Sequence, residues 1–212
     1  MQLYSFFNSS TSYRVRIVLA LKGLDHDYQG INIRKLEHRA TEYMARNPSG
    51  SVPMLRDGDM ELGQSMAIID YLDATYPEPR LIPRDTLQRA RVLELSGVVA
   101  CDIHPVNNLR ILRYLTEVLG VTAEQKDAWY RHWVQDGMRA VEALLERHGH
   151  GPYCFGDAPT LADVCLVPQI ANAQRMGCDM SAYPRAMAVY AHCNTIAAFQ
   201  RAAPSEQPDY TA

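Results

Sequence analysis

The spacing of hydrophobic residues changes about a third of the way along this 212-residue chain. Up to residue 77, short apolar runs of strand length alternate with segments in which apolar residues recur every three or four positions, as in helices. From residue 86 onward only the helical spacing remains. The pattern therefore predicts a mixed first domain, residues 1–80, and an all-helical second domain, residues 86–212.

The first domain is predicted to have the element order β-α-β-α-β-β-α. Its strands are expected in residues 1–7, in 26–33 and, as a pair, in 51–63. Its helices are expected to lie between the first two strands, ending at Gly23, and in residues 34–48 and 64–77. A tight turn at Asp57–Gly58 is expected to join the last two strands, and Ser65 is the expected N-cap of the third helix. This order favours a mixed sheet with crossover helices.

Residues 77–85 contain three prolines and are predicted to be a linker, held in place by Leu81 and Ile82. Beyond the linker, helical spacing continues through residues 87–106, 123–149, 160–177 and 183–202. Usual helix lengths then predict a bundle of about five or six helices. Thr160 and Asp163 have the spacing of a capping box, and the polar tail, residues 203–212, is predicted to be loosely held.

Charge, apolar runs, cysteines and histidines each argue against particular classes of protein. The formal net charge is −3 with both signs interspersed, so neither nucleic acid nor an anionic membrane surface is expected as a partner. No N-terminal signal pattern and no apolar run long enough to span a bilayer is present, so the expected location is the cytoplasm. The five cysteines are odd in number and lie mostly in apolar contexts, which indicates reduced thiols, and the scattered histidines predict no metal site.

Three hydroxyl residues, Ser9, Ser10 and Thr11, precede the first predicted helix. The element order suggests the thioredoxin architecture, in which this junction normally holds a redox cysteine. Here the free N–H groups of the helix, its dipole and several hydroxyl donors would stabilise a thiolate supplied by another molecule. A thiol of pKa about 8.5 is mostly protonated at neutral pH, so such stabilisation matters chemically. The alternative is a simple N-cap cluster.

Two further positions fit the same architecture. A proline inside a strand-like segment removes a donor from the sheet, yet Val52-Pro53 stands where the thioredoxin architecture places a cis-proline facing the junction. An edge-strand trans-proline is the alternative. Gln64 and Ser65 precede the third helix, whose first N–H groups could bind a carboxylate.

The segments SSTSYRVRIVLALKG, NPSGSVPML and GQSMAIIDYLDATYP resemble the zeta class of glutathione transferases, which opens with a Ser-Ser-Cys-x-Trp-Arg-Val-Arg-Ile-Ala-Leu signature. The resemblance continues through HPVNNLRILR, TLADVCLVPQIANAQR and the C-terminal FQ, so it covers essentially the whole chain. It implies an α+β glutathione transferase fold, with a thioredoxin-like N-terminal domain and an all-α C-terminal domain. It also implies glutathione as cofactor and a homodimer.

The resemblance assigns roles in glutathione binding. Ser9 corresponds to the catalytic serine, Ser10 is its neighbour, and Thr11 stands where the class usually has cysteine. A threonine hydroxyl can still donate to a thiolate. The remaining residues expected to hold glutathione are Val52 across cis-Pro53 for the cysteinyl backbone, Gln64 and Ser65 for the γ-glutamyl carboxylate, and His104 and Asn108 along the cleft.

The resemblance also implies a dianionic substrate. Arg110 and Arg175 are the expected carboxylate-binding residues, because the planar guanidinium can bind both oxygens of a carboxylate. Asn8 stands where the class often has a cation. Arg14 and Arg16, in the first helix, are expected to be structural ion-pair partners.

The implied activity is cis–trans isomerisation in aromatic catabolism. A glutathione thiolate adds to a conjugated cis double bond, which rotates and re-forms trans as the thiolate leaves. Conversion of maleylpyruvate to fumarylpyruvate in gentisate catabolism is preferred, because Arg110 offers a cation for the shorter pyruvoyl carboxylate. The alternatives are a maleylacetoacetate isomerase, a transferase that conjugates small electrophiles, and a non-catalytic ligand-binding member. A disulfide reductase is disfavoured because the junction has no cysteine.

Overall fold

A four-stranded sheet organises the first part of the computed structural model, which describes residues 1–211. The strands are β1 (Gln2–Ser5), β2 (Asp27–Gly30), β3 (Met54–Asp57) and β4 (Met60–Gly63), in the spatial order β2-β1-β3-β4. β1 is parallel to β2 and antiparallel to β3, and β3 is antiparallel to β4. The predicted mixed sheet is therefore confirmed.

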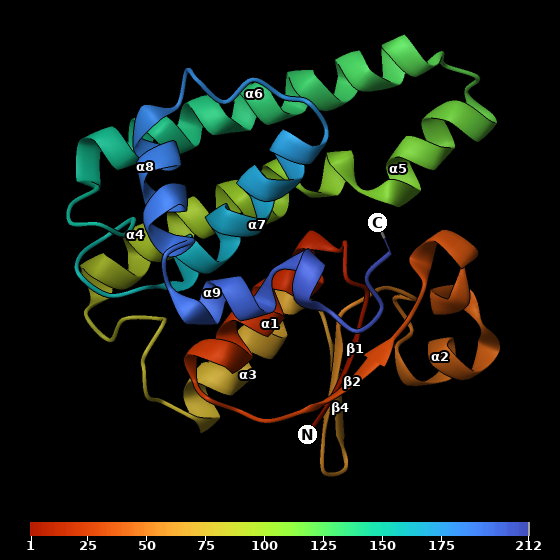
Figure 1. Ribbon diagram of the computed structural model, residues 1–212, viewed down its shortest axis with the longest axis horizontal. Coiled ribbons are helices and arrows are strands. Elements are labelled where there is room, and N and C mark those ends of the chain that lie inside the picture. The colour runs from red at the N-terminus through yellow and green to blue at the C-terminus, as the bar shows by residue number, and fades with distance from the viewer. Residues whose placement is uncertain (212) are drawn as a thin grey trace. The chain divides into compact units, whose positions relative to one another are not determined.

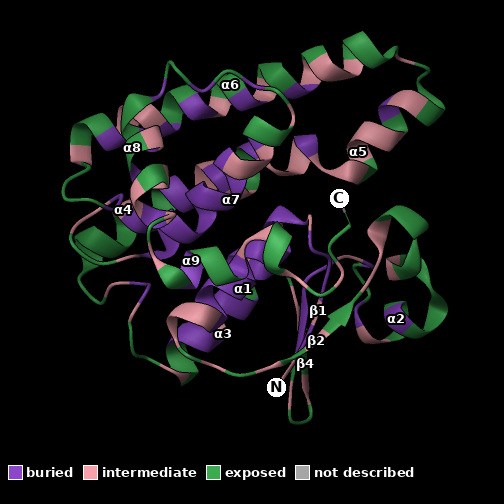
Figure 2. Cartoon of the chain, in the orientation of Figure 1, coloured by how far each residue is buried: buried purple, intermediate pink, exposed green. Residues whose placement is uncertain are grey.

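Helices α1 (Ser10–Leu21) and α3 (Ser65–Thr75) lie on one side of this sheet (Figure 1). Leu3 of β1 pairs with Leu55 of β3, and both side chains are fully buried. Figure 2 shows α1 buried along most of its length, since α3 and α9 (Ala197–Ala202) both pack against it. Helix α1 is thus held between α3 and α9.

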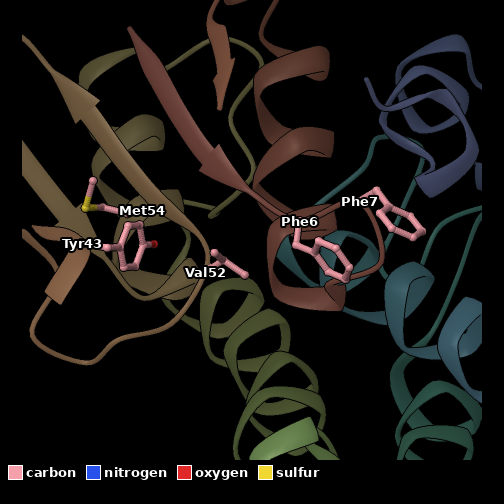
Figure 3. Close-up of a cluster of buried hydrophobic side chains, with 5 residues drawn as sticks. All are labelled: Phe6, Phe7, Tyr43, Val52 and Met54. Carbon is pink, nitrogen blue, oxygen red and sulfur yellow. The ribbon is translucent and has the colours of Figure 1, made fainter. Parts of the chain in front are cut away.

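A smaller hydrophobic cluster lies on the opposite face of the sheet. Side chains alternate along a strand, so Met54 faces away from its neighbour Leu55, and it packs in one cluster with Tyr43 of α2 (Thr41–Arg46). Figure 3 shows Tyr43 beside Met54, with Val52 and the two phenylalanines that follow β1 further along. The cluster therefore joins the segment before Pro53 to the end of β1.

The continuous helix predicted for residues 34–48 is wrong in its first half. Two short 3₁₀ turns, Ile33–Lys35 and Glu37–Arg39, precede α2. Leu36 separates them with a left-handed backbone (φ +63°), which a right-handed helix cannot contain. Asn32 starts the first turn, because its side chain accepts hydrogen bonds from the N–H groups two and three residues later.

Two local predictions at the end of the sheet need correction. The loop between β3 and β4 is Gly58–Asp59, one residue later than predicted, because Asp57 still pairs with Met60 and Gly58 takes the positive φ. Ser65 is the first residue of α3 and not its N-cap, a position that Gln64 occupies. The helix start is therefore displaced by one residue.

The C-terminal tail is held in place over residues 203–211, contrary to the prediction of a loose tail; residue 212 lies outside the described part of the chain. Asp209 accepts hydrogen bonds from the Phe7 N–H (3.1 Å) and from the Tyr28 hydroxyl (2.7 Å). The Tyr210 ring meets Phe7 edge-on, with centroids 5.4 Å apart. The tail thus anchors the end of β1 through contacts that span about the whole chain.

Helices from residue 86 to residue 193 form a second body of the chain. They are α4 (Thr86–Gly97) with a π-helical continuation (Val98–Ile103), a 3₁₀ turn (Pro105–Asn107), α5 (Leu109–Arg113) with a π-helical continuation (Tyr114–Val118), α6 (Ala123–His148), α7 (Leu161–Arg175) and α8 (Pro184–Cys193). The predicted bundle is confirmed, and so is the capping box, in which Asp163 accepts from the Thr160 N–H at 2.8 Å. None of the described helices has the length and apolar character that a bilayer crossing needs.

Residue contacts divide the chain into two compact units. The first unit is Met1–Leu81 together with the segment that begins at Asn194, and the second unit is Ile82–Cys193. Leu81 and Ile82 of the predicted linker are both buried, as expected. Residues 194 onward belong to the first unit, so the units do not share all their boundaries with the predicted domains 1–80 and 86–212.

Candidate active site

The predicted hydroxyl cluster lies where β1 passes into α1. Ser9 is the N-cap of α1, and its Oγ accepts from the Ser12 N–H at 3.2 Å. The same Oγ lies 2.9 Å from the hydroxyl of Thr11, which in turn donates to the Val52 carbonyl at 3.0 Å. The structure therefore brings three predicted site residues, Ser9, Thr11 and Val52, into one hydrogen-bonded chain.

The number of protons limits what this junction can donate. A hydroxyl has one proton, and that of Thr11 goes to the Val52 carbonyl, so Ser9 is the donor of the bond between the two hydroxyls. Ser9 can donate to a bound thiolate only after its O–H turns away from Thr11. Ser10 is buried beside it, and within residues 1–211 its hydroxyl has no hydrogen-bond partner.

The Val52–Pro53 peptide is cis, as predicted. The carbonyl of the preceding residue, Ser51, accepts from the Tyr43 hydroxyl (2.7 Å) and the Asn47 amide (2.6 Å), which fixes the loop. The Val52 N–H has no hydrogen-bond partner in the described part of the chain. It is a main-chain donor available to a peptide ligand.

The start of α3 lacks a cap. The N-cap residue, Gln64, makes no capping hydrogen bond through its side chain, and it has a φ of +67°, a conformation that residues other than glycine adopt at a cost and mostly at functional sites. The Gln64 side chain is exposed, whereas Ser65 is buried. The first N–H groups of a helix have no carbonyl partner inside it, so this start can bind an anion.

Arg16 holds the segment between β1 and α1 in place through hydrogen bonds to main-chain carbonyls. Its guanidinium is buried and donates to the carbonyls of Phe6 (3.3 Å), Phe7 (2.9 Å) and Ala202 (2.9 Å). Burial lowers the pKa of Arg16 to about 10. Among residues 1–211 neither Arg16 nor Arg14 forms an ion pair, so the predicted ion-pair role is wrong. Charged residues in an otherwise apolar helix were the only sequence signal for this support.

The predicted site residues of the second unit are a contacting pair, His104 and Asn108, and two exposed arginines, Arg110 and Arg175. His104 Nε2 lies 3.3 Å from the Asn108 side-chain amide, and Asn108 also caps α5. Arg110 is exposed on α5. Arg175 is exposed in the last turn of α7, where it donates to Asn172 Oδ1 at 2.5 Å.

The contact of Asn172 with Arg175 was not anticipated from the sequence. Asn172 donates to the Tyr130 hydroxyl at 2.6 Å, and Tyr130 is almost fully buried. Arg175 is therefore oriented by a chain of polar contacts that starts in the helical core. An asparagine three residues before the arginine was the only available signal.

The cysteines and histidines do not form a second centre within residues 1–211. Burial raises the pKa of Cys154, Cys178 and Cys193, so these thiols stay protonated and are poor nucleophiles. All five cysteines are free, and only Cys101 among them is exposed. No group of three or more metal-binding side chains occurs among the described residues.

Two protein-family models match the chain. The glutathione S-transferase N-terminal domain matches residues 1–74, and the C-terminal domain matches residues 127–192. The family therefore covers most of the chain, in the order that the two units follow.

Individual relatives match over nearly the full length. A probable maleylacetoacetate isomerase of Vibrio cholerae is 47% identical over 98% of this chain and 97% of that protein. A maleylpyruvate isomerase of a Ralstonia species is 46% identical over 99% of each.

Solved structures agree with these relatives. A holo structure of a maleylpyruvate isomerase, described as a bacterial zeta-class glutathione transferase, superposes with a TM-score of 0.97 over all of both chains, at 46% identity. A maleylacetoacetate isomerase of Anaeromyxobacter dehalogenans with glutathione in its active site has a TM-score of 0.89 over 99% of this chain and 97% of that one, at 39% identity.

Proposed function

The chain belongs to the zeta class of the glutathione transferase family, and we propose that it isomerises maleylpyruvate to fumarylpyruvate with glutathione as its cofactor. The observation that carries this proposal is the hydrogen-bonded chain from Ser9 through Thr11 to Val52 beside a cis-proline. It places hydroxyl donors where related folds use a cysteine, so the reactive sulfur must come from a ligand.

The residues present fit a γ-glutamyl peptide thiol. Val52 offers an unused main-chain N–H for the cysteinyl backbone. Gln64 and Ser65 stand at an uncapped helix start that suits the γ-glutamyl carboxylate. His104 and Asn108 are proposed to complete the glutathione site, on the family resemblance.

Glutathione, when bound, supplies a thiolate that can add reversibly to a conjugated double bond. The task of the chain is to keep this sulfur ionised. The Ser9 hydroxyl and the first N–H groups of α1 lower the pKa of a thiol at the junction by donating to its charged form, while Thr11, whose proton goes to the Val52 carbonyl, accepts the Ser9 proton when no ligand is bound. Each unit of pKa is worth roughly 1.4 kcal/mol. Ser9 donates a hydrogen bond and transfers no proton.

Arg110 and Arg175 are the proposed ligands of the two substrate carboxylates. Both side chains are exposed, and both can form paired hydrogen bonds to a carboxylate. The contact with Asn172 holds one guanidinium in a defined orientation. Their charge orients the dianion and stabilises the negative charge that develops as the double bond is attacked.

A maleylacetoacetate isomerase is the second candidate, because the Vibrio cholerae relative carries that name at 47% identity. Arg110 favours the shorter maleylpyruvate, whose pyruvoyl carboxylate needs a nearby cation. We further propose that the enzyme works in the cytoplasm as a homodimer, as the family resemblance implies.

The direct test is an isomerisation assay of the purified protein with maleylpyruvate and maleylacetoacetate side by side, each with and without glutathione. Glutathione-dependent turnover that is faster for maleylpyruvate is the expected result. Faster turnover of maleylacetoacetate would move the chain to the second candidate. Turnover of neither substrate would overturn the isomerase proposal.

A further inference from the structure

Arg14 is a buried cation that the fold itself does not use. Its side chain is 1% exposed, and its only hydrogen bond within residues 1–211 runs from Nη1 to Ser65 Oγ at 3.4 Å. Nε and Nη2 are buried and have no partner in that part of the chain. Burying a charge without partners is costly, and an apolar residue of the same size would fill this space more cheaply.

The neighbouring arginine shows the difference. Arg16 is equally buried, but its guanidinium bonds to main-chain carbonyls and to the Ser5 hydroxyl. Its charge has a structural use. Arg14 lies two residues earlier on the same helix, and the structure supplies it with neither carbonyls nor a carboxylate among residues 1–211.

What Arg14 contacts is the start of α3. Ser65 is the first residue of that helix, which has 11 residues and no side-chain cap. Because Ser65 Oγ accepts from Arg14, the hydroxyl proton of Ser65 is left to donate elsewhere. The guanidinium charge adds to the positive end of the α3 dipole, and in a buried setting it acts at longer range than it would in water.

We propose that Arg14 is a positioning residue for the γ-glutamyl α-carboxylate of glutathione, acting through Ser65 and the positive potential at the start of α3. This proposal rests on the proposed function. The ligand carboxylate is the missing counter-charge of Arg14. The guanidinium does not touch the ligand, because its nitrogens are buried; it orients the Ser65 hydroxyl and raises the affinity for an anion.

The test compares Arg14→Met with Arg56→Met, which removes an exposed arginine of the same unit and serves as the charge control. Calorimetry measures the dissociation constants of glutathione and of an analogue whose γ-glutamyl α-carboxylate is an amide. Arg14→Met is expected to weaken glutathione binding roughly 10- to 30-fold and to leave binding of the amide analogue nearly unchanged. Arg56→Met is expected to change neither, and Arg14→Lys to recover part of the affinity for glutathione.

Thermal unfolding of the ligand-free variants separates this role from a structural one. The Tm of Arg14→Met is expected to equal or exceed that of the unmodified protein, because an unpaired buried charge has been removed. A Tm lower by several degrees, with the preference for glutathione over the amide intact, would overturn the proposal. If Arg14→Met does not fold, Arg14→Gln, which keeps a donor for Ser65 without the charge, decides the same comparison.

The outcome for the unmodified protein separates the two proposals. If it binds glutathione but does not prefer it over the amide analogue, Arg14 has no carboxylate to act on and only this inference fails. If it does not bind glutathione at all, the proposed function fails as well.

Discussion

The N-termini of α1 and α3 lie in the same unit but are built in opposite ways. At α1 the hydroxyls of Ser9 and Thr11 are already used: Ser9 caps the helix, and its proton and that of Thr11 go to acceptors within the chain. At α3 no side chain caps the helix, Gln64 is in an unfavourable backbone conformation, and a buried guanidinium lies behind Ser65.

This difference matches two kinds of ligand. A thiolate must be released and re-bound within each reaction cycle, so a hydroxyl that can turn between Thr11 and the sulfur suits the α1 junction. A carboxylate that only anchors the cofactor stays bound, so the donors at α3 can be left unpaired until the ligand arrives. Leaving these donors unpaired lowers the free energy of unfolding of the ligand-free protein.

The largest effect is expected from Ser9→Ala, which removes the donor proposed for the sulfur. Turnover should fall roughly 100- to 1,000-fold, as for other single donors to a developing or resting anion. Loss of the N-cap should also reduce the free energy of unfolding by about 1 kcal/mol. Steady-state kinetics and thermal unfolding measure the two effects.

Ser9→Asp separates catalysis from capping, because aspartate also caps helices but its carboxylate has no proton to donate. It should lose turnover as Ser9→Ala does while keeping most of the stability. Full activity in either variant would remove Ser9 from the mechanism and leave it as a cap.

A smaller and opposite pair of effects is expected from Gln64→Gly. Glycine adopts a positive φ without strain, so the variant should be more stable by about 1 kcal/mol, a Tm rise of roughly 2–4 °C. Loss of the side chain should weaken glutathione binding about tenfold. Calorimetry measures the change in glutathione affinity, and thermal unfolding measures the change in Tm. A Tm lower than that of the unmodified protein would show that the backbone of Gln64 is not strained.

Asp209→Asn tests whether the tail supports the α1 junction. The carboxylate accepts from the Phe7 N–H and the Tyr28 hydroxyl, so the neutral amide should weaken both bonds and reduce stability by about 1–2 kcal/mol. Turnover should fall only a few-fold, because the effect on Ser9 is indirect. Tyr210→Leu is the control for packing of the tail without loss of the carboxylate. A Tm unchanged in Asp209→Asn would contradict this anchoring role.

Local sequence patterns predicted the parts of the fold that depend on near neighbours. The strands and the Thr160–Asp163 capping box follow from residues close in sequence, whereas the cis-proline was predicted from its place in the thioredoxin architecture; all are confirmed. The helix through 34–48 was wrong because its hydrophobic spacing is helical, whereas the Asn32 turn and the left-handed Leu36 interrupt it. The spacing of hydrophobic residues does not reveal where a single residue with a left-handed backbone interrupts a helix.

The parts of the site that escaped prediction depend on distant residues. Asp209 meets Phe7 across about 200 positions, so nothing near the tail marks it as ordered. Arg14 and Arg16 are alike in sequence, and only the carbonyls and hydroxyls around each guanidinium distinguish them. The two helix starts likewise share a serine in the first turn, and their opposite hydrogen bonding is set by tertiary contacts.

The smallest effect, and the sharpest test of the contrast between the helix starts, is expected from Thr11→Val. The variant keeps the shape of the side chain but removes the acceptor of the Ser9 proton and the donor to Val52. Stability should fall by about 1 kcal/mol, and turnover should change by no more than a few-fold, because Ser9 is then free to donate to sulfur. The pKa of the bound thiol, followed by ultraviolet absorbance of the thiolate, should stay the same or fall. A rise of that pKa by a unit or more would mean that Thr11 itself donates to the sulfur, and the two hydroxyls would then share the role assigned to Ser9.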